Sequence, residues 1–377
     1  MTLRLEWRLP RRVDVLIVFA DTSHQLREYF PQKRVSVLDL DDPTRNVFAL
    51  IASLILRRVS VLGYLAGYVA LTRPRLVVSM QDNFEPLWRL KALCPDVAIA
   101  LVQNGLRTSE IGHGSLLHQS VPEVDHYFCF DNSAAEVMRT RLRASYTRSG
   151  SFRSNHTKRI LKVEHTLAYI STFRSDLSPS FVVDGGVDQR HMTYGEIWAS
   201  RVEVLRRIRD YGQSHELGLR ILGKDLDHES EFDFYAAALG ASSFDFVPRR
   251  DQHFQHAETD RARVVVSTGS TLGLESLSRG NRTAIFDQMP ALLNQPSQRF
   301  GWPSVLPTEG PFWSESATAD RIATVIRFLI ECSDAEWQST LSEYQAQIPV
   351  FDPGNSLFCE KLKHFGAQSP RRPSSDS

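Results

Sequence analysis

A run of small hydroxyl and glycine residues between two apolar segments is the first candidate for chemistry in this sequence. The run consists of Ser267, Thr268, Gly269, Ser270 and Thr271. Glycine lets a backbone approach a ligand closely, hydroxyls donate short hydrogen bonds, and a following helix offers unsatisfied N–H groups to an anion. The pattern therefore favours a phosphate-binding loop. A tight strand-to-helix turn, with Ser270 or Thr271 as the helix cap, fits the same residues.

Two basic residues at the ends of predicted strands could neutralise such a phosphate. Arg174 follows the apolar segment 167–171, and Lys224 follows 219–222. Ligands bind at the carboxyl ends of strands in open α/β sheets, and these positions are therefore suited to an anion. Each residue alone is also compatible with a solvated surface charge.

Polar residues in the first half of the chain could supply a proton acceptor or a nucleophile. Asp82 is the first choice because it follows a predicted strand, 75–80, and Asp21, Glu110 and His113 are the other candidates. Asp82 fits the role of a plain helix cap equally well. The loop after the next strand contains Gln103, Asn104 and Arg107, which we expect to bind an acceptor substrate.

The composition excludes several classes of function. Lys plus Arg and Asp plus Glu number 44 each, and so no net charge draws the chain to nucleic acid. The four cysteines have no metal-ligand spacing and the 12 histidines form no zinc motif, from which we expect chemistry without a metal or other cofactor. The apolar region 46–71 is split by Arg57 and Arg58 into pieces too short to span a bilayer. Two buried helices are the simplest interpretation, and a peripheral membrane contact stays open.

Apolar strands alternate with helical segments along most of the chain, which is typical of an α/β fold with parallel sheets. Its 377 residues favour two domains. We predict two Rossmann-like domains facing each other across a cleft, namely 1–155 for the acceptor and 156–350 for the nucleotide sugar. The Ser- and Arg-rich segment 145–162 is the predicted connection. A helix within 351–366 would pack back on the first domain, and 367–377 is a predicted disordered tail.

The segment STGSTLGLESLSRGNRTAIF resembles the donor site of glycosyltransferases with the GT-B fold. The resemblance implies that residues 267–271 contact the donor phosphates and that Glu275 contacts the ribose. Further segments resemble bacterial proteins of surface-carbohydrate biosynthesis, including O-antigen, capsule and lipopolysaccharide. They are QDNFEPLWRL, ALVQNGLR, FCFDNSAAEVM, RSGSFRSN, SEFDFYAAAL and FDPGNSLF. The chain lacks the pair of glutamates that frames the donor loop of retaining enzymes, which leaves the stereochemical course open.

The resemblance implies an enzyme that transfers a sugar from a nucleotide-activated donor to a glycan or lipid-linked glycan. It would work in the cytoplasm, with a peripheral contact to the inner face of the membrane left open. A donor of the CMP-Kdo type is one expectation. A sugar-nucleotide 2-epimerase, a polyol-phosphate transferase of the same fold and a non-catalytic nucleotide-binding scaffold remain alternatives.

Overall fold

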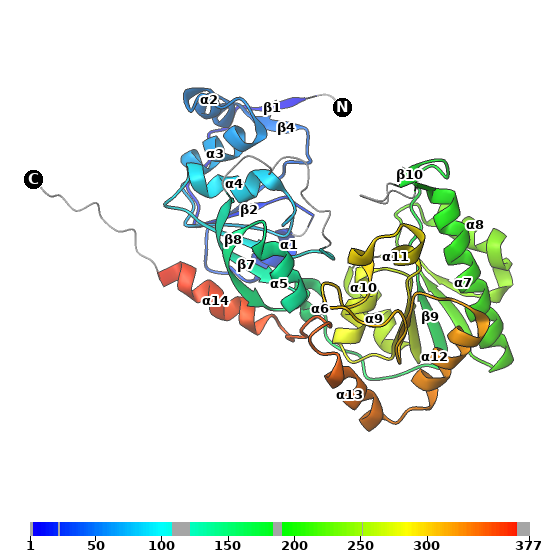
Figure 1. Cartoon of the computed structure of the whole chain (residues 1–377). Helices are drawn as coiled ribbons and strands as arrows, with labels where there is room; N and C mark the ends of the chain where they lie inside the picture. The colour runs from blue at the N-terminus through cyan, green and yellow to red at the C-terminus, as the bar shows by residue number, and fades with distance from the viewer. Residues whose placement is uncertain (1–2, 22, 108–120, 184–190, 251, 368–377) are drawn as a thin grey trace, which may run out of the picture.

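The computed structural model describes residues 3–21, 23–107, 121–183, 191–250 and 252–367, which form two α/β domains (Figure 1). Each domain is built on a six-stranded sheet whose paired strands are all parallel. Parallel neighbours require crossover connections, and helices supply them in both domains. The predicted fold class of two Rossmann-like domains is confirmed.

The first sheet has the strand order β3-β2-β5-β6-β7-β8. Its strands are β2 (Val15–Val18), β3 (Val35–Leu38), β5 (Leu76–Ser79), β6 (Ala98–Val102), β7 (Glu123–Cys129) and β8 (Arg143–Arg148). The accompanying helices are α1 (Ser23–Glu28), α2 (Val47–Ile55), α3 (Val61–Thr72), α4 (Glu85–Leu93) and α5 (Asn132–Arg139). Alternate strand residues join two apolar clusters, because successive side chains point to opposite faces of a sheet.

The second sheet has the order β13-β12-β9-β14-β15-β16. Its strands are β9 (Thr166–Ile170), β12 (Gly218–Leu222), β13 (Asp245–Val247), β14 (Val264–Ser267), β15 (Thr283–Phe286) and β16 (Trp313–Ser314). Its helices are α7 (Tyr194–Ser214), α8 (His228–Leu239), α9 (Gln252–Arg261), α10 (Thr271–Ser278), α11 (Met289–Leu292), α12 (Ala319–Glu331) and α13 (Asp334–Glu343). Strand β9 lies between β12 and β14, which brings the ends of three strands together at the site described below.

The chain crosses between the domains twice. It leaves the first domain through α6 (Phe152–His156) and returns to it with α14 (Ser356–Ala367). The ring of Phe358 on α14 packs 4.8 Å from Phe128 and 5.1 Å from Phe152, measured between ring centroids. The predicted boundary between residues 155 and 156 lies in the first crossing, and α14 lies in the segment expected to return. Residues 368–377 of the predicted tail lie outside the described residues.

Three segments differ from the sequence-based expectation. Arg143–Arg148 forms the edge strand β8, where a connection was predicted. Its residues are exposed or half-buried, and an edge strand of this kind has the polar composition of a linker. Helix α9 was not predicted. Between β9 and α7, where no strand was expected, β10 (Val182–Val183) and β11 (Met192–Thr193) form a short antiparallel pair.

Candidate nucleotide-binding and active site

A cavity of about 530 Å³ opens beyond the carboxyl ends of β9, β12 and β14. Ile170, Leu222 and Gly269, at or just after these strand ends, line its base. Asn104 from the first domain and Arg153 from α6 line the same cavity. A Cβ atom on Gly105 would lie 3.9 Å from the Thr271 hydroxyl oxygen, and thus the two domains approach closely here. The cavity therefore lies between the domains.

The predicted phosphate loop divides into a buried half and an open half. Ser267 and Thr268 are buried, and the Thr268 hydroxyl lies 3.1 Å from the hydroxyl of Tyr169. Gly269, Ser270 and Thr271 line the cavity. The backbone of Gly269 has a φ of 93°, and a Cβ there would lie 2.7 Å from an Asp287 carboxylate oxygen, which explains the glycine.

Helix α10 begins at this loop without a side-chain cap. Ser270 is its N-cap residue, but the Ser270 side chain makes no capping hydrogen bond. The hydroxyl of Ser267 instead accepts a bond of 3.2 Å from the Ser270 N–H, which shapes the turn. The N–H groups of the first helical turn, which point along the helix axis, therefore suit an anion in the cavity.

Five cationic side chains line the cavity, and they come from five different segments. They are Arg153, Arg174, Arg201, Lys224 and Arg249. Glu275 is the one acidic residue among the described residues that line it. The Nε atoms of Arg153 and Arg201 are buried without a hydrogen-bond partner in the described structure. Unpaired buried donors are costly, and an anionic ligand would satisfy them.

This concentration of positive charge affects the pKa of Lys224. Burial lowers the pKa of Lys224, and the charges of Arg174, Arg201 and Arg249 lower it further. Glu231 places the lysine: the carboxylate accepts the backbone N–H groups of Lys224 and Asp225 at 2.9 and 3.1 Å. Because Glu231 is itself fully buried, the loop after β12 is held firmly at the cavity edge.

Arg174, the other predicted phosphate ligand, lines the same cavity from the end of β9. It also forms a two-pronged ion pair with Asp176, with a distance of 2.9 Å from Nε to Oδ1. The Arg174 side chain is 45% exposed, and the Asp176 side chain is 61% exposed. An exposed pair of this kind holds weakly, and Arg174 can therefore turn to a ligand.

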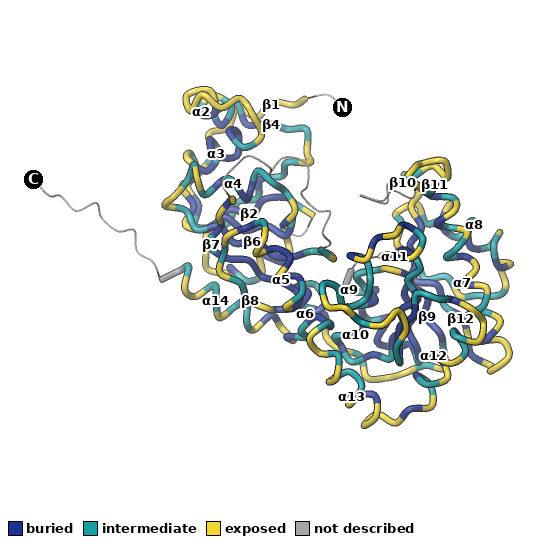
Figure 2. The backbone as a smooth tube through the Cα atoms, viewed as in Figure 1, coloured by how far each residue is buried: buried dark blue, intermediate teal, exposed yellow. Residues whose placement is uncertain are grey.

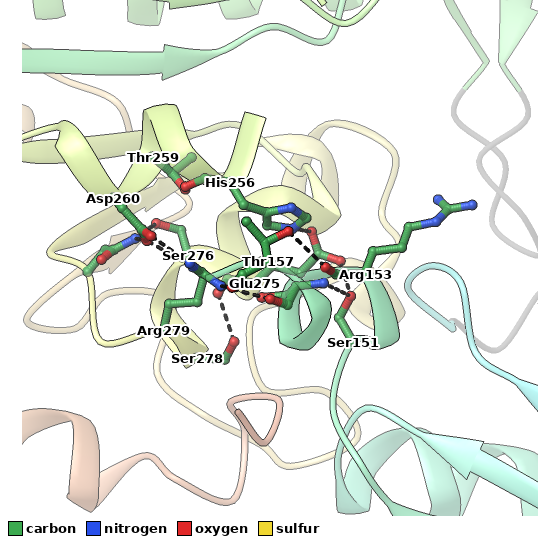
Figure 3. A network of polar contacts seen from close by, with 12 residues as sticks. Ser151, Arg153, Thr157, His256, Thr259, Asp260, Glu275, Ser276, Ser278 and Arg279 are labelled. Atoms are coloured by element: carbon green, nitrogen blue, oxygen red, sulfur yellow. Dashed lines mark hydrogen bonds and ion pairs between the residues drawn. The ribbon is translucent and has the colours of Figure 1, made fainter. Parts of the chain in front are cut away.

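Glu275 connects the cavity to the segment between the domains. One carboxylate oxygen accepts a hydrogen bond from the Ser151 hydroxyl, and the other lies 2.9 Å from Nε2 of His256 (Figure 3). Burial raises the pKa of Glu275, but the charge of His256 and hydrogen bonds from His256 and Ser151 outweigh it and leave the pKa below its ordinary value. Glu275 is therefore an anionic hydrogen-bond acceptor at the cavity wall.

A second buried group holds α6 against the second domain. Arg279 forms a two-pronged ion pair with Asp260, and its Nη1 donates to the carbonyl oxygens of Ser154 and Thr157 (Figure 3). Both charged side chains are fully buried, and the pairing compensates for their desolvation. Arg153 extends away from this network, toward the cavity (Figure 3).

Asp82, the first choice for the catalytic group, is not among the residues that line the cavity. Its carboxylate is fully buried, forms a two-pronged ion pair with Arg107, and accepts hydrogen bonds from the Tyr127 hydroxyl and the Asn104 N–H. A carboxylate with these partners has no surface for a substrate. Its bonds hold the Asn104–Arg107 loop in place, and the catalytic role stays a prediction. The sequence could not distinguish these roles because the partners lie 22 to 45 residues away.

The other predicted residues of the first domain have different surroundings. Asp21 is exposed and lies 3.6 Å from Nη2 of Arg153, near the first cavity. Gln103 is buried and donates to the Gly105 carbonyl oxygen at 2.7 Å. Glu110 and His113 lie outside the described residues. No group of three or more His, Cys, Asp or Glu that could bind a metal occurs in the described ranges.

A second cavity, of about 370 Å³, lies on the other side of the Gly269 loop. Gly269, Ser270 and Gln298 line both cavities, so the two are neighbours. The first domain contributes Gln103, Leu106, Arg107, Phe130, Asp131, Ser133 and Ala134, and the second contributes Asp287, Arg299, Phe300 and Trp302 among others. Carboxylates, amides and aromatic rings together form a surface suited to a sugar.

Asp131 is the carboxylate that the first domain presents to this second cavity. One oxygen caps α5 by accepting the Ala134 N–H at 2.8 Å. Burial raises the pKa of Asp131 to about 6, although backbone hydrogen bonds from Ala134 and Ser133 oppose the rise. A carboxylate with this pKa is ionised at neutral pH and basic enough to accept a proton.

Comparison with known proteins shows which family the chain belongs to. Residues 100–365 match the model of a family described as "putative O-antigen biosynthesis protein". The chain belongs to this family. The match covers more than half of the sequence, including both cavities and the two crossings. No curated protein matches the chain.

Solved structures show that this member of the O-antigen biosynthesis family has the GT-B fold. A "putative UDP-N-acetylglucosamine 2-epimerase" from Listeria monocytogenes has a TM-score of 0.55 at 12% identity, over 96% of this chain and 99% of the other. UDP-GlcNAc 2-epimerase from Methanocaldococcus jannaschii has a TM-score of 0.50 at 9% identity, over 93% and 99%. The wall teichoic acid polymerase TagF has a TM-score of 0.50 at 9% identity, over 94% and 89%.

Several residues at the two cavities of this family member were not predicted from the sequence. They are Ser151, Arg153, Arg201, Arg249, His256, Asp131 and Asp287. A signal existed for three of them: Ser151 and Arg153 belong to the family-like segment RSGSFRSN, and Asp131 belongs to FCFDNSAAEVM. Arg201 and His256 lie on helices, where no local pattern marks one residue as facing a cavity.

Proposed function

We propose that this protein transfers a sugar from a nucleotide-activated donor to a growing bacterial surface glycan. The observation that carries the proposal is the cavity lined by five cations and a single, already paired, carboxylate. The positive charges in such a site repel one another when it is empty, and a strongly anionic ligand stabilises them. The adjoining second cavity offers separate space for an acceptor, which a transfer reaction needs.

The clustering of cations in the first cavity favours a diphosphate-linked donor over a donor of the CMP-Kdo type. Two adjacent phosphates can engage several cations together, whereas a donor of the CMP-Kdo type carries one of its two negative charges on the sugar, away from the phosphate. Two of the similar solved structures are described as complexes with UDP, one of these also with UDP-GlcNAc. In our proposal the α10 N-terminus, Lys224 and Arg201 bind the phosphates, and the Glu275 carboxylate accepts the ribose hydroxyls. A carboxylate has about four lone-pair positions, and Glu275 has capacity beyond Ser151 and His256.

We propose Asp131 as the proton acceptor. The acceptor hydroxyl oxygen would attack the anomeric carbon, the bond from that carbon to the phosphate oxygen would break, and the hydroxyl proton would pass to Asp131. The cations of the first cavity would stabilise the charge that develops on the leaving diphosphate. Asp21, beside Arg153, remains the other candidate from the first domain. We place the reaction in the cytoplasm, on a glycan or lipid-linked glycan acceptor.

Nucleotide binding followed by product analysis tests this function. The first step is a thermal-shift screen against UDP, GDP, CDP-glycerol and CMP, because a ligand of the folded state raises the melting temperature. The matching nucleotide sugar is then incubated with and without membrane glycan extracts. A transferase releases nucleotide only with acceptor. An epimerase changes the nucleotide sugar alone, and CDP-glycerol turnover indicates a polyol-phosphate transferase. Binding without turnover of any donor would indicate a scaffold and refute the proposal.

A further inference from the structure

The loop between α2 and α3, together with the helix ends on either side of it, exposes large apolar side chains. These side chains, which we call the apolar tip, are Leu54, Ile55, Leu56, Val59 and Val61. Ile55 is 77% exposed and Val59 is 83% exposed. In the whole of α2, only Ala49 and Ser53 are buried. A contiguous apolar surface of this kind on a folded protein marks an interaction site.

The apolar tip is a firmly packed part of the fold. Asn46 caps α2, with its side chain accepting the Phe48 and Ala49 N–H groups at 3.1 and 3.2 Å. A Cβ on Gly67 would lie 2.6 Å from the Ala49 carbonyl oxygen, and so α2 and α3 approach to backbone contact. The Ser53 hydroxyl donates to the Arg58 carbonyl oxygen inside the turn. The exposed apolar residues are therefore presented by a defined hairpin.

A second apolar strip lies on the same part of the molecule. It consists of Leu3, Leu5, Trp7 and Leu9, and Trp7 is 70% exposed. Strand β1 (Arg4–Glu6) carries this strip and pairs with β4 (Thr44–Asn46), which leads directly into α2. The Asn46 side chain donates to the Arg8 carbonyl oxygen at 2.7 Å. Figure 1 shows β1, β4, α2 and α3 together at one end of the first domain, and Figure 2 shows exposed residues along β1 and α2.

Basic side chains surround these apolar residues. Arg57 and Arg58 are exposed within the hairpin turn, and Arg4, Arg8, Arg11 and Arg12 are exposed along the N-terminal segment. The exposed acidic residues nearby in the chain are Glu6, Asp41 and Asp42. The arginines exceed the acids six to three. The surface therefore combines apolar groups with net positive charge.

We propose that the apolar tip and the strip 3–9 bind the surface of an anionic lipid bilayer. Apolar side chains would enter the boundary between headgroups and acyl chains, while the arginines contact anionic headgroups. A second copy of this chain fits less well, because a symmetric contact would bring the same excess of arginines face to face. No helix within the described ranges is long and apolar enough to cross a membrane. This surface contact is independent of the reaction proposed above.

Vesicle flotation of the full-length protein tests the proposal. We expect flotation with vesicles of phosphatidylcholine and phosphatidylglycerol, little with phosphatidylcholine alone, and a decrease as salt rises. The double variant Ile55→Glu/Val59→Glu should reduce the partition coefficient by about tenfold or more, because it places charge in the apolar boundary. Arg57→Glu/Arg58→Glu should reduce binding to the anionic vesicles specifically.

Val305→Glu is the matched control, since Val305 is 94% exposed in the second domain, far along the chain from this surface. It should float like the unchanged protein. Circular dichroism and nucleotide thermal shift check that the variants fold, which separates this proposal from the proposed function. Equal flotation of Ile55→Glu/Val59→Glu and the unchanged protein would overturn the proposal. A concentration-dependent dimer that the same variant abolishes, without vesicle binding, would assign the surface to a second copy instead.

Discussion

The Ser151 hydroxyl donates a hydrogen bond to the Glu275 carboxylate, joining the start of α6 to helix α10. Ser151 lies in the crossing between the domains, and Glu275 lies in the wall of the cation-lined cavity. A ligand that draws on the Glu275 carboxylate therefore acts on the same group that holds the crossing segment. If Glu275 contacts the ribose as we propose, nucleotide binding would act on the contact between α6 and α10 through this one side chain.

Glu275→Gln should weaken nucleotide binding by roughly ten- to a hundredfold, because hydrogen bonds to a charged acceptor contribute about 1.5–3 kcal/mol. The amide keeps the size of the side chain, and the fold should persist. Titration calorimetry with the best nucleotide from the thermal screen measures the change. Ser151→Ala serves as the control, because it removes the other side of the contact without touching the carboxylate. Unaltered nucleotide affinity in Glu275→Gln would remove Glu275 from the ribose site.

Lys224→Met should lower the affinity for a nucleoside diphosphate more than the affinity for the corresponding nucleoside. The variant keeps an unbranched side chain but removes one charge from the cluster, and a charge-assisted bond of about 1.5–3 kcal/mol is lost. Relief of repulsion with Arg174 and Arg201 should raise the melting temperature of the unliganded protein slightly. Arg206→Met, on the exposed part of α7, is the charge-matched control. An equal loss for nucleoside and diphosphate would contradict a phosphate contact.

Asp82→Asn should destabilise the protein by about 3–5 kcal/mol, because it leaves the Arg107 charge buried without its partner. Urea unfolding followed by circular dichroism measures this loss. The double variant Asp82→Asn/Arg107→Met should recover part of the stability, since no unpaired charge remains. If Asp82→Asn instead unfolded at the same urea concentration as the unchanged protein and lost only turnover, Asp82 would be catalytic after all.

Asp131→Asn should abolish most transfer while leaving nucleotide binding intact. With the unchanged protein, the rate should fall as pH drops through about 6, where Asp131 takes up a proton. The stability effect has the opposite direction. Because the folded pKa lies above the ordinary value of 3.8, the folded state holds its proton more tightly, and stability declines as pH rises through 3.8 toward about 6.

Rate profiles and urea unfolding between pH 4 and 7 check both effects. Asp131→Asn should flatten the stability decline in that window. Ser133→Ala, which also lies at the second cavity, is the control for local packing. Full transfer activity in Asp131→Asn would exclude Asp131 as the proton acceptor and favour Asp21 instead.

The alternation of strands and helices was readable from the sequence because buried parallel strands are continuous apolar runs. Val264, Val265 and Val266 are an example, and all three are fully buried. The glycine loop after them was equally readable, since Gly269 adopts a backbone conformation that other residues rarely take. Edge strand β8 was missed because solvent contact removes the apolar pattern from which strands are recognised.

The roles of individual charged residues depended on contacts across the chain. Asp82 and Arg107 are 25 residues apart, and neither shows locally that the other neutralises it. Similarly, Arg201 and His256 lie on α7 and α9, and only the packing of these helices brings them to the cavity. Local sequence indicates which loops could bind a ligand, while long-range pairing determines which carboxylates are already neutralised by another residue.

The pairing of Asn155 with Asn355 has a consequence for how this chain is made. Their side chains are 3.1 Å apart and buried, and Asn355 also donates to the Tyr29 hydroxyl and the Phe152 carbonyl oxygen. The first domain thus receives α14 only after the second domain has been synthesised. Until then the surface around Phe128 and Phe152 is uncovered. Although domains generally fold in the order of their synthesis, the first domain of this chain completes its packing only after the second has been made.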